Sequence, residues 1–470
     1  MKYRVIPAAL LIASGAMAQD VRSLVLSDVR VVDIARGAVS APVSVVISDG
    51  AIAAIGTLDD IAPGSAIHDA KGQFLIPGLW DSHVHLFTSA DEPETAFRMA
   101  IVNGVTGLRD MGALWPIADQ QALRDATESG ATVGPRLILS GAWVDASPGS
   151  WPGMFLADTP TAAQQVVARI ADEGWDAVKA YSMLDGATYA ALAEAAHRAG
   201  LKLVGHVPER VTLSDALDAG QDGIEHFGRV TKACSPRERA MVDRVATALD
   251  ADNPRDAMIA EMTGHNRIVL DTWDAALCGA VLARMARAGM HVSPTLVVAG
   301  FYTGRKAAPD SPRMRMLPQA VRDAWAGPDF RLDAMTDDLR AIADAAIALD
   351  HRTLALAHAA GVPILASTDA SFANPQLFHG FSLLDELDLY VAAGLTPREA
   401  LYTATVAPPR FFRLRDQDGS IAPGRRADLV LLDANPLEGL ATLRDPAAVI
   451  LRGVMLDRGA LAEMRAADPG

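Results

Sequence analysis

Cysteine is nearly absent from the sequence, and basic residues are outnumbered by acidic ones. Two cysteines among 470 residues are too few for a scaffold held together by disulfides. The 42 Lys and Arg residues against 57 Asp and Glu residues give a net charge of −15, which argues against nucleic acids and anionic membrane surfaces as partners. After the signal-like N-terminus, no uncharged apolar run reaches the ~18 residues of a spanning helix. A hydrophobic content of 50% excludes a disordered chain.

The N-terminus has the layout of an export signal. Two positive charges precede an apolar run over residues 5–12, and small residues with Ala-x-Ala spacing end at Ala18. We predict a signal peptide over residues 1–18, a periplasmic or secreted mature chain, and no membrane contact after cleavage. An uncleaved anchor is the alternative, but the run is too short to span a bilayer comfortably. In the exported chain, Cys234 and Cys278 would either form one disulfide or remain two buried thiols.

The two ends of the mature chain are rich in short strands. At ~100–200 residues per domain, the length allows two or three domains, or one large barrel with a smaller attached unit. Strand patterns occur at residues 24–26, 29–32, 43–47, 51–55, 428–433 and 448–451. Neither end is large enough to bury a core alone, so we predict one small β-sandwich domain formed by residues 19–74 together with 413–470.

The segment between these ends, residues 75–412, has a different rhythm. Short apolar runs alternate with Ala- and Leu-rich helical stretches, which is typical of βα units and a parallel sheet. Eight strands are expected, at residues 74–79, 105–109, 136–140, 177–181, 202–207, 223–227, 291–298 and 362–367. This number predicts an α/β fold of the (β/α)8 TIM-barrel type, with a mostly helical insertion at 229–289. An open doubly wound sheet is the alternative, but no Gly-rich phosphate loop supports it.

Histidines follow three of the expected strands. His83 and His85 end the first strand, and alternate residues of an extended chain share one face, as two ligands of one metal ion require. His206 and His226 follow the fifth and sixth strands. Taken singly, each of these residues has an ordinary reading, because short His-x-His pairs are often incidental and a lone strand-end His is usually a hydrogen-bonded core residue.

A lysine and an aspartate occupy two further strand ends. Lys179 is one of only six lysines and lies within an apolar strand, where burial favours the neutral amine. A neutral lysine can react with CO₂ to give a carbamate that bridges two metal ions, whereas a salt-bridged structural lysine is the ordinary reading. Asp369 follows the eighth strand, where an Asp is often only a helix N-cap.

The conjunction of these residues is more informative than any one of them. All would face the mouth of one barrel, where catalytic groups gather in this architecture. Imidazole and carboxylate ligands without Cys favour zinc, with manganese, iron or cobalt as alternatives. The sequence therefore predicts a metal centre built from His83, His85, Lys179, His206, His226 and Asp369.

These residues, together with four longer segments, resemble the metal-dependent amidohydrolase superfamily over nearly the whole mature chain. The segments are residues 75–85 (LIPGLWDSHVH), 103–110, 393–401 and 424–430. Within the superfamily, they are most similar to the imidazolonepropionase-like and prolidase-like (Xaa-Pro dipeptidase-like) branch. The export signal and Lys179 point away from true imidazolonepropionases, which are usually cytoplasmic and mononuclear.

The resemblance implies a binuclear centre of two divalent metal ions, expected to be Zn²⁺. His83, His85 and Asp369 would hold the inner ion, and His206 and His226 the outer ion. Carboxylated (carbamylated) Lys179 would bridge the two. Asp369 is also the expected catalytic residue, taking a proton from the attacking hydroxide and passing it to the leaving nitrogen.

The expected function is cleavage of an amide, peptide or cyclic amide C–N bond by a metal-bridging hydroxide. A lactone or ester hydrolase on the same site and a non-catalytic binding protein on this scaffold are the alternatives. The expected partner is a small-molecule substrate, and homo-oligomer formation is left open. The candidates for substrate contacts are Tyr181, Trp143, Trp151, Arg210 and His379, with both tryptophans assigned to the loop after the third strand.

Two segments of the chain differ from the prolidase-like pattern, and one neighbouring residue, Glu225, is left out of the catalytic set. Relatives of that branch tend to carry a His in the loop after the third strand, and this chain has none between Trp143 and Trp151. The segment from His206 to Arg210 also departs from the pattern. Glu225 precedes His226 on a strand, so it is expected to point away from the mouth, into the layer between barrel and helices.

Overall fold

The computed structural model describes residues 23–57, 65–302, 306–329, 335–414 and 417–468. The predicted signal peptide, residues 1–18, lies outside these ranges. Within them, no helix is both long enough and apolar enough to cross a membrane.

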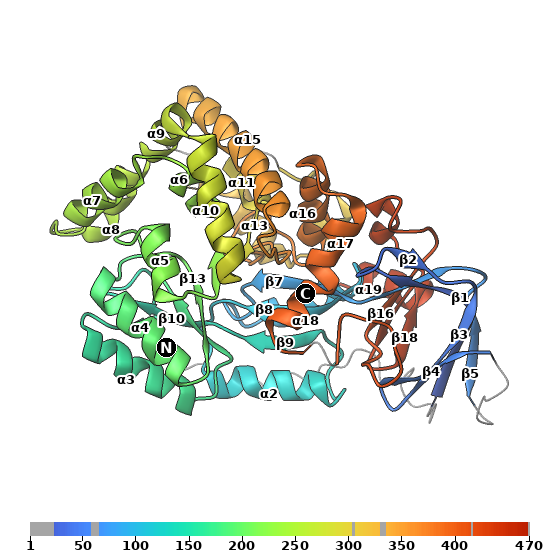
Figure 1. The fold of residues 1–470 in the computed structure, drawn as a ribbon. Helices are drawn as coiled ribbons and strands as arrows, with labels where there is room; N and C mark the ends of the chain where they lie inside the picture. Colours follow the sequence, from blue (N-terminus) through green and yellow to red (C-terminus); the bar gives the residue numbers. More distant parts are fainter. Residues whose placement is uncertain (1–22, 58–64, 303–305, 330–334, 415–416, 469–470) are drawn as a thin grey trace.

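The two ends of the chain meet in a single nine-stranded sheet, at the right of Figure 1. The strand order is β18-β17-β16-β6-β1-β3-β4, with β2 and β5 also paired to β1. The core of this sheet mixes both ends of the sequence, because side chains such as Leu26 and Val45 are buried together with Leu429 and Ile450. The strands are β1 (Ser23–Asp33), β2 (Ala38–Val39), β3 (Val43–Ser48), β4 (Ala51–Gly56), β5 (Ala66–Asp69), β6 (Phe74–Pro77), β16 (Leu429–Leu432), β17 (Ala448–Leu451) and β18 (Val454–Asp457).

The strand pairing bears on two details of the predicted organisation. The described strands form one continuous path through β1, and a sandwich of two sheets is not confirmed. The predicted first barrel strand, 74–79, spans two elements, because β6 pairs antiparallel with β16 in the terminal sheet. The chain crosses to the barrel at Gly78, where a Cβ atom would lie 2.0 Å from Thr106 Oγ1. Gly78 therefore links β6 of the terminal sheet to β7 of the barrel.

The remaining strands form a TIM-barrel-like arrangement of parallel strands. They pair in three groups, β7-β8-β9, β11-β10-β12-β13 and β14-β15. The third barrel position is divided, since β9 pairs with β8 whereas β10 pairs with β12. The strands are β7 (Leu79–Val84), β8 (Val105–Asp110), β9 (Arg136–Leu139), β10 (Ala142–Asp145), β11 (Phe155–Leu156), β12 (Ala177–Ala180), β13 (Lys202–Gly205), β14 (Gly223–Glu225) and β15 (His291–Ser293).

The eighth barrel position is an irregular segment and not the regular strand predicted at 362–367. Leu365 N donates to Val292 O at 2.8 Å on one side, and Ser82 N donates to Ala366 O at 2.8 Å on the other. These bonds close the ring between β15 and β7. The segment leaves the extended conformation at Asp369, whose φ is 60°.

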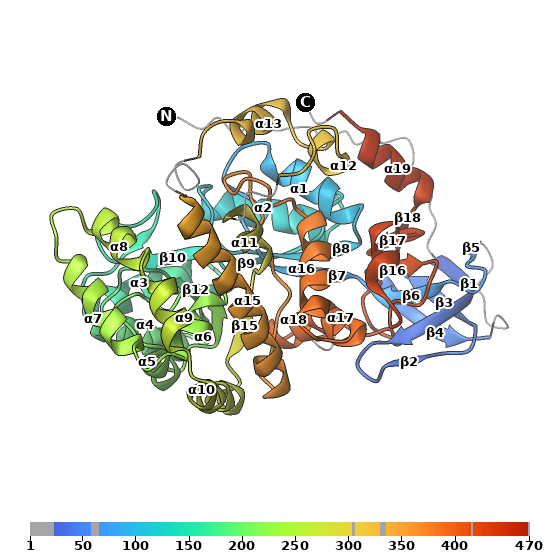
Figure 2. The same cartoon turned by 90° about the horizontal axis from the view of Figure 1, so that it is seen from above.

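Helices surround the barrel (Figures 1 and 2). Side-chain caps fix the start of several of them, and α5 and α17 carry full capping boxes from Thr212 and Thr396. The helices outside the insertions are α1 (Glu92–Ile101), α2 (Ile117–Glu128), α3 (Pro160–Asp172), α4 (Gly186–Arg198), α5 (Leu213–Ala219), α16 (Phe381–Ala392), α17 (Pro397–Thr405), α18 (Ala407–Phe411), α19 (Arg458–Ala466) and the 3-10 helix η2 (Leu440–Arg444).

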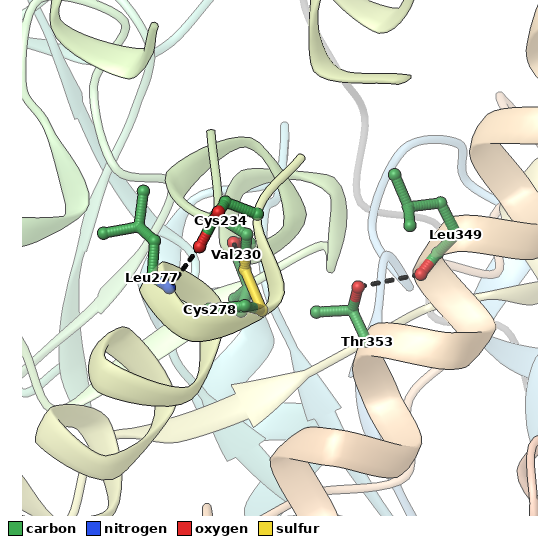
Figure 3. Close-up of a disulfide and its surroundings, with 7 residues drawn as sticks. Val230, Cys234, Leu277, Cys278, Leu349 and Thr353 are labelled. Carbon is green, nitrogen blue, oxygen red and sulfur yellow. Dashed lines mark hydrogen bonds between the residues drawn. A yellow bond between two sulfur atoms is a disulfide. The ribbon is translucent and has the colours of Figure 1, made fainter. Parts of the chain in front are cut away.

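Two helical insertions interrupt the barrel before and after β15. The predicted helical insertion at 229–289 is confirmed, and it lies on the side of the barrel away from the terminal sheet, with α6, α9 and α10 beside α15 (Figures 1 and 2). A disulfide between Cys234 and Cys278 joins the end of α6 to α10 (Figure 3). The helices are α6 (Gly228–Ala233), α7 (Glu238–Ala248), α8 (Pro254–Met262), α9 (His265–Thr272), α10 (Ala275–Ala288), α11 (Val297–Tyr302), α12 (Pro312–Arg315), α13 (Gln319–Ala326) and α15 (Asp337–Ala359).

Candidate metal centre

His83, His85 and Asp369 converge at the mouth of the barrel. His83 lies on β7 and His85 directly after it, so both rings point to the same side. Asp369 Oδ1 is 3.3 Å from His83 Nε2 and 3.1 Å from His85 Nε2. The backbone fixes this approach, because Asp369 N donates to His83 O at 2.8 Å. A ligand atom from each of the three residues lies within 4.8 Å of the others, close enough to share one metal ion.

The other ring nitrogens of His83 and His85 are held by acceptors. His83 Nδ1 donates to Glu225 Oε2 at 2.9 Å, and His85 Nδ1 donates to Gly112 O at 3.0 Å. A carboxylate and a carbonyl can only accept, so Nδ1 carries the proton in both rings and Nε2 presents a lone pair. Both imidazoles are thereby fixed in the tautomer that a metal ligand needs.

His226 and His206 continue the same row of imidazoles. The ring centroids of His83 and His226 are 5.1 Å apart, and those of His226 and His206 are 5.0 Å apart. Burial lowers the pKa of His226 to about 4 and that of His206 well below its usual value. Both rings are therefore neutral near pH 7, which is the state that binds metal.

Hydroxyl groups orient these two rings. His226 Nδ1 is 2.9 Å from Thr295 Oγ1, and His206 Nδ1 is 3.0 Å from Ser182 Oγ. All four imidazoles thus use Nδ1 for an anchoring contact. Apart from the contacts of His83 and His85 with Asp369, no contact in the described part of the chain uses their Nε2 atoms. The four rings therefore lie in one row, each anchored through Nδ1.

Lys179 lies on β12, and its side chain is buried. Its Nζ donates to Met111 O at 2.7 Å and lies 5.7 Å from the ring centroid of Trp143 and 5.9 Å from that of Tyr181. It forms no ion pair within the described ranges. Burial lowers the pKa of Lys179 to about 8, so a substantial fraction of the amine is neutral at mildly alkaline pH.

Glu225 is part of this site, contrary to the expectation that it points away from the mouth. It holds His83 Nδ1 and also accepts from Arg109 Nη2 at 2.6 Å. The expectation was wrong because His226 has a φ of 68°, so the chain leaves the extended conformation after Glu225 and successive side chains no longer alternate. Burial would raise the pKa of Glu225, but Arg109 and His83 hold it well below its usual value.

Arg109 was also missed from the sequence, although a signal was present. It is an arginine within the apolar strand β8 and is 1% exposed. An arginine buried to this extent requires a carboxylate partner. Its partner is Glu225, and a further donor reaches Ser293 Oγ at 3.1 Å.

Two more buried carboxylates hold the segments that carry the site. Asp81 Oδ2 accepts from Thr368 Oγ1 at 2.7 Å, which ties β7 to the segment before Asp369. Asp110 Oδ2 accepts from Leu86 N at 2.8 Å, just after His85. Burial raises the pKa of both Asp81 and Asp110 to about 7. These residues position the chain and do not face the row of imidazoles as additional ligands.

The donor set fits a divalent metal ion. His83 Nε2 is buried and has no hydrogen-bond partner of its own, although it faces Asp369. A buried imidazole lone pair without a donor is costly in an otherwise satisfied interior, and a metal ion would satisfy it. Nitrogen and carboxylate donors without thiolates suit zinc and the other first-row divalent ions.

Three of the five residues predicted to contact substrate lie beside this centre. The Tyr181 ring stacks on His206 with centroids 4.3 Å apart, and its Oη accepts a hydrogen bond from Trp151 Nε1 at 2.8 Å. Trp151 is 46% exposed at the rim. Trp143 lies within β10 and not in the predicted loop, and its buried ring is 5.7 Å from that of His85 between centroids.

The other two predicted contacts lie elsewhere. Arg210 Nη2 donates to Asp250 Oδ1 at 2.9 Å, which links the end of β13 to the helical insertion. His379 is buried, and its Nε2 is 3.2 Å from Glu92 Oε1. Neither residue lines the cavity described next.

A cavity of about 620 Å³ opens beside His206 and His226. Its floor is formed by these two histidines together with Ser182. Its walls come from the helical insertions, mainly α6, α9, α11 and α15. The site therefore combines a cluster of metal-type ligands with a space large enough for an organic molecule.

A model of the amidohydrolase family matches residues 74–456 of this chain. The chain belongs to the amidohydrolase family. A dihydroorotase of Pelotomaculum thermopropionicum is 26% identical over 422 residues, which cover 87% of this chain and 88% of that protein. The enzyme is therefore a hydrolase that acts on carbon–nitrogen bonds, and the resemblance predicted from the sequence is confirmed.

Solved structures of this amidohydrolase's relatives share its fold. A bottromycin amidohydrolase superposes with a TM-score of 0.70 at 25% identity, over 95% of this chain and 92% of its own. A Xaa-Pro dipeptidase with methionine bound in its active site superposes with a TM-score of 0.65 at 19% identity, over 93% and 100% of the two chains. The structural neighbours thus include members of the prolidase-like branch.

Proposed function

We propose that this chain is an exported, binuclear metal-dependent amidohydrolase that cleaves an amide, peptide or cyclic amide C–N bond with water. The observation that carries the proposal is the row of four imidazoles, each anchored through Nδ1, in which His83 and His85 face Asp369 at the mouth of the barrel. The names of the related proteins, a dihydroorotase, an amidohydrolase and a Xaa-Pro dipeptidase, support C–N cleavage.

His83, His85 and Asp369 would hold the inner ion, and His206 and His226 the outer ion. When bound, divalent metal lowers the pKa of water from 15.7 toward about 7 and polarises the carbonyl group of the substrate. Lys179 would complete the centre as a carbamate, formed when its neutral amine adds to CO₂ with release of one proton. The burial of Lys179 without an ion pair among the described residues supports this role, because a charged ammonium is disfavoured there.

Asp369 would move the proton. Burial alone would raise its pKa, but His83 and the neighbouring imidazoles hold it well below the usual value, so the carboxylate is ionised and able to accept. Its Oδ1 faces the shared space between the two imidazoles. From there it would take the proton of the attacking water and deliver it to the leaving nitrogen, which departs as a neutral amine.

The disulfide supports export. Disulfides persist in oxidising compartments and are rare in the cytoplasm. Cys234 and Cys278 are the only cysteines of the sequence and are paired. This agrees with the signal predicted at residues 1–18 and with a periplasmic or secreted enzyme.

Metal content and turnover test the proposal together. We expect about two equivalents of divalent metal per chain and hydrolysis of at least one class within a panel of dipeptides, N-acyl amino acids and cyclic amides. Lys179→Ala should lose metal and activity together, and short carboxylates such as acetate or formate should restore part of both. Two full equivalents of metal in Lys179→Ala would remove the bridging carbamate from the proposal, and a metal-loaded wild-type protein that cleaves no C–N bond would overturn it.

A further inference from the structure

The cavity beside the metal centre has a composition that defines a class of substrate. Building on the proposed function, we infer that it receives a bulky apolar substituent on one side of the scissile amide. The helical insertions, and not the barrel, would thus select which amides are cleaved.

The α15 wall presents an apolar stripe that the described part of the chain covers only in part. Leu339, Ile342, Ala343, Ala346 and Ile347 follow the i, i+3, i+4, i+7, i+8 spacing of one helix face, and all of them line the cavity. Each is only half-buried. An apolar face of this kind normally packs against a partner, so an apolar ligand that covered it would be stabilised by the surface it removes from water.

A second part of the lining is also largely apolar. Val269 and Leu270 of α9 and Met262 at the end of α8 line the cavity together with α15. Its volume of about 620 Å³ lies within the range of pockets that enclose a small organic molecule, about 300–1,000 Å³. Because His206 and His226 form its floor, a molecule that fills the cavity also touches the candidate metal ligands.

The charged residues of the cavity are largely neutralised by one another. Arg229 Nη1 and Lys232 Nζ, both on α6, reach the same carboxylate of Glu209 at 3.0 and 3.3 Å. On the α15 side, burial raises the pKa of Asp350 to about 6, as expected for a carboxyl group in largely apolar surroundings. Near pH 7 Asp350 is still mostly ionised, so the two cations of the cavity are balanced by two carboxylates, Glu209 and Asp350. With no net positive charge to attract an anion, the cavity favours an uncharged substituent over an anionic one of the same length.

Two small residues leave the room for this substituent. Ala343 and Ala346 lie in the middle of the α15 stripe, where a larger side chain would project into the cavity. Ala345 lies on the exposed face of the same helix and does not line the cavity. It offers a matched control, since the same substitution there has the same effect on helix propensity without filling the space.

The experiment compares Ala346→Trp with Ala345→Trp in the metal-loaded enzyme. The substrates are N-acetyl-, N-(4-phenylbutanoyl)- and N-glutaryl-alanine, with N-acetyl-phenylalanine to place the bulky group on the amine side. We expect Ala346→Trp to lose at least tenfold in kcat/KM for one of the two bulky apolar substrates and less than threefold for N-acetyl-alanine. Ala345→Trp should match the wild type. Ala346→Leu is a smaller change, and its kcat/KM should fall between those of the two Trp variants. It takes the place of Ala346→Trp if that variant does not fold.

Binding of a product analogue separates this inference from the proposed function. 4-Phenylbutyrate should raise the thermal unfolding midpoint of the wild type and of Ala345→Trp but not of Ala346→Trp, and acetate should raise none. If no amide is cleaved but this pattern holds, the proposed function fails and the cavity assignment stands. Equal kcat/KM losses on all substrates, no loss on either bulky substrate, or a wild-type preference for glutaryl over phenylbutanoyl would overturn the inference.

Discussion

Among the residues that the structure describes, Asp369 is the one carboxylate that faces both imidazoles of the His-x-His pair. Its position after an irregular eighth segment, with a φ of 60°, brings Oδ1 into the space that the two Nε2 atoms share. Four histidines remain to hold metal when this carboxylate is changed. Its role as a proton acceptor can therefore be separated from its role as a ligand.

We predict that Asp369→Asn lowers kcat by at least about 100-fold, within the range that a positioned general base contributes. The metal content should fall by less than half, because the imidazole donors are unchanged. Steady-state kinetics and elemental analysis on the same preparation measure both quantities. Asp172→Asn, at the exposed end of α3, is the control and should match the wild type. A wild-type kcat in Asp369→Asn would show that another group accepts the proton.

Glu225 acts through His83 and not on the substrate. Its carboxylate fixes the tautomer of that ring and neutralises the buried Arg109. We predict that Glu225→Gln weakens zinc affinity about 10- to 100-fold, as loss of a carboxylate behind a metal-bound histidine does. Competition with a chromophoric chelator measures the affinity.

The same variant also leaves Arg109 without its carboxylate, so a loss of stability must be separated from a loss of positioning. Adding Arg109→Met removes the unpaired charge and should recover part of the unfolding midpoint. The weakened zinc affinity should persist in this double variant. If the unfolding midpoint and the zinc affinity both recover in the double variant, Glu225 serves stability alone.

Some of these residues could be predicted from the sequence and others could not. The His-x-His pair follows from strand alternation, because β7 stays extended through His83. Glu225 was misplaced because His226 adopts a left-handed backbone conformation, which alternation cannot reveal. Trp143 was misplaced because a second short strand, β10, resumes after the bend at Gly141 and carries it back into the barrel.

The sequence predicts that most barrel strands exist, but it predicts their bounds less well. Seven of the eight expected barrel strands overlap a strand of the structure, but the first runs across β6 and β7, and the eighth is an irregular segment. The reason is that both misassigned stretches are apolar runs whose hydrogen-bond partners are distant in sequence. Apolar runs indicate burial, whereas only the long-range pairing decides which sheet a strand joins.

The disulfide closes a 44-residue loop that contains most of the helical insertion. Replacing Cys234 and Cys278 with Ser should lower the free energy of unfolding by about 2–4 kcal/mol, because the unfolded chain regains the freedom that this crosslink removes. Urea unfolding followed by circular dichroism measures the change. Treatment of the wild-type protein with a reductant should also lower its free energy of unfolding. Two free thiols per wild-type chain under non-reducing denaturation would contradict the pairing.

The whole molecule brings together parts that are far apart in the sequence. The terminal sheet needs strands from both ends of the chain, since β6 pairs with β16 across some 350 residues. The site likewise draws on the ends of barrel strands from His83 to Asp369. A chain truncated after the barrel would lose β16 and its neighbours, and with them five of the thirteen buried side chains in the core of the terminal sheet. Both units are therefore expected to fold only in the full-length chain.

The compartment of the whole enzyme can be tested at its N-terminus. We predict that the full-length chain, expressed in a Gram-negative host, is cleaved after Ala18, so that the mature protein begins at Gln19. Intact mass and N-terminal sequencing of the periplasmic fraction measure the cleavage, and a variant with Ala16 and Ala18 replaced by Arg is the control that should remain uncleaved. The exported form should carry the Cys234–Cys278 disulfide, whereas a form without residues 1–18 that stays in the cytoplasm should contain free thiols. Full-length, uncleaved protein in the cytoplasmic fraction would show that the apolar N-terminal run is not an export signal.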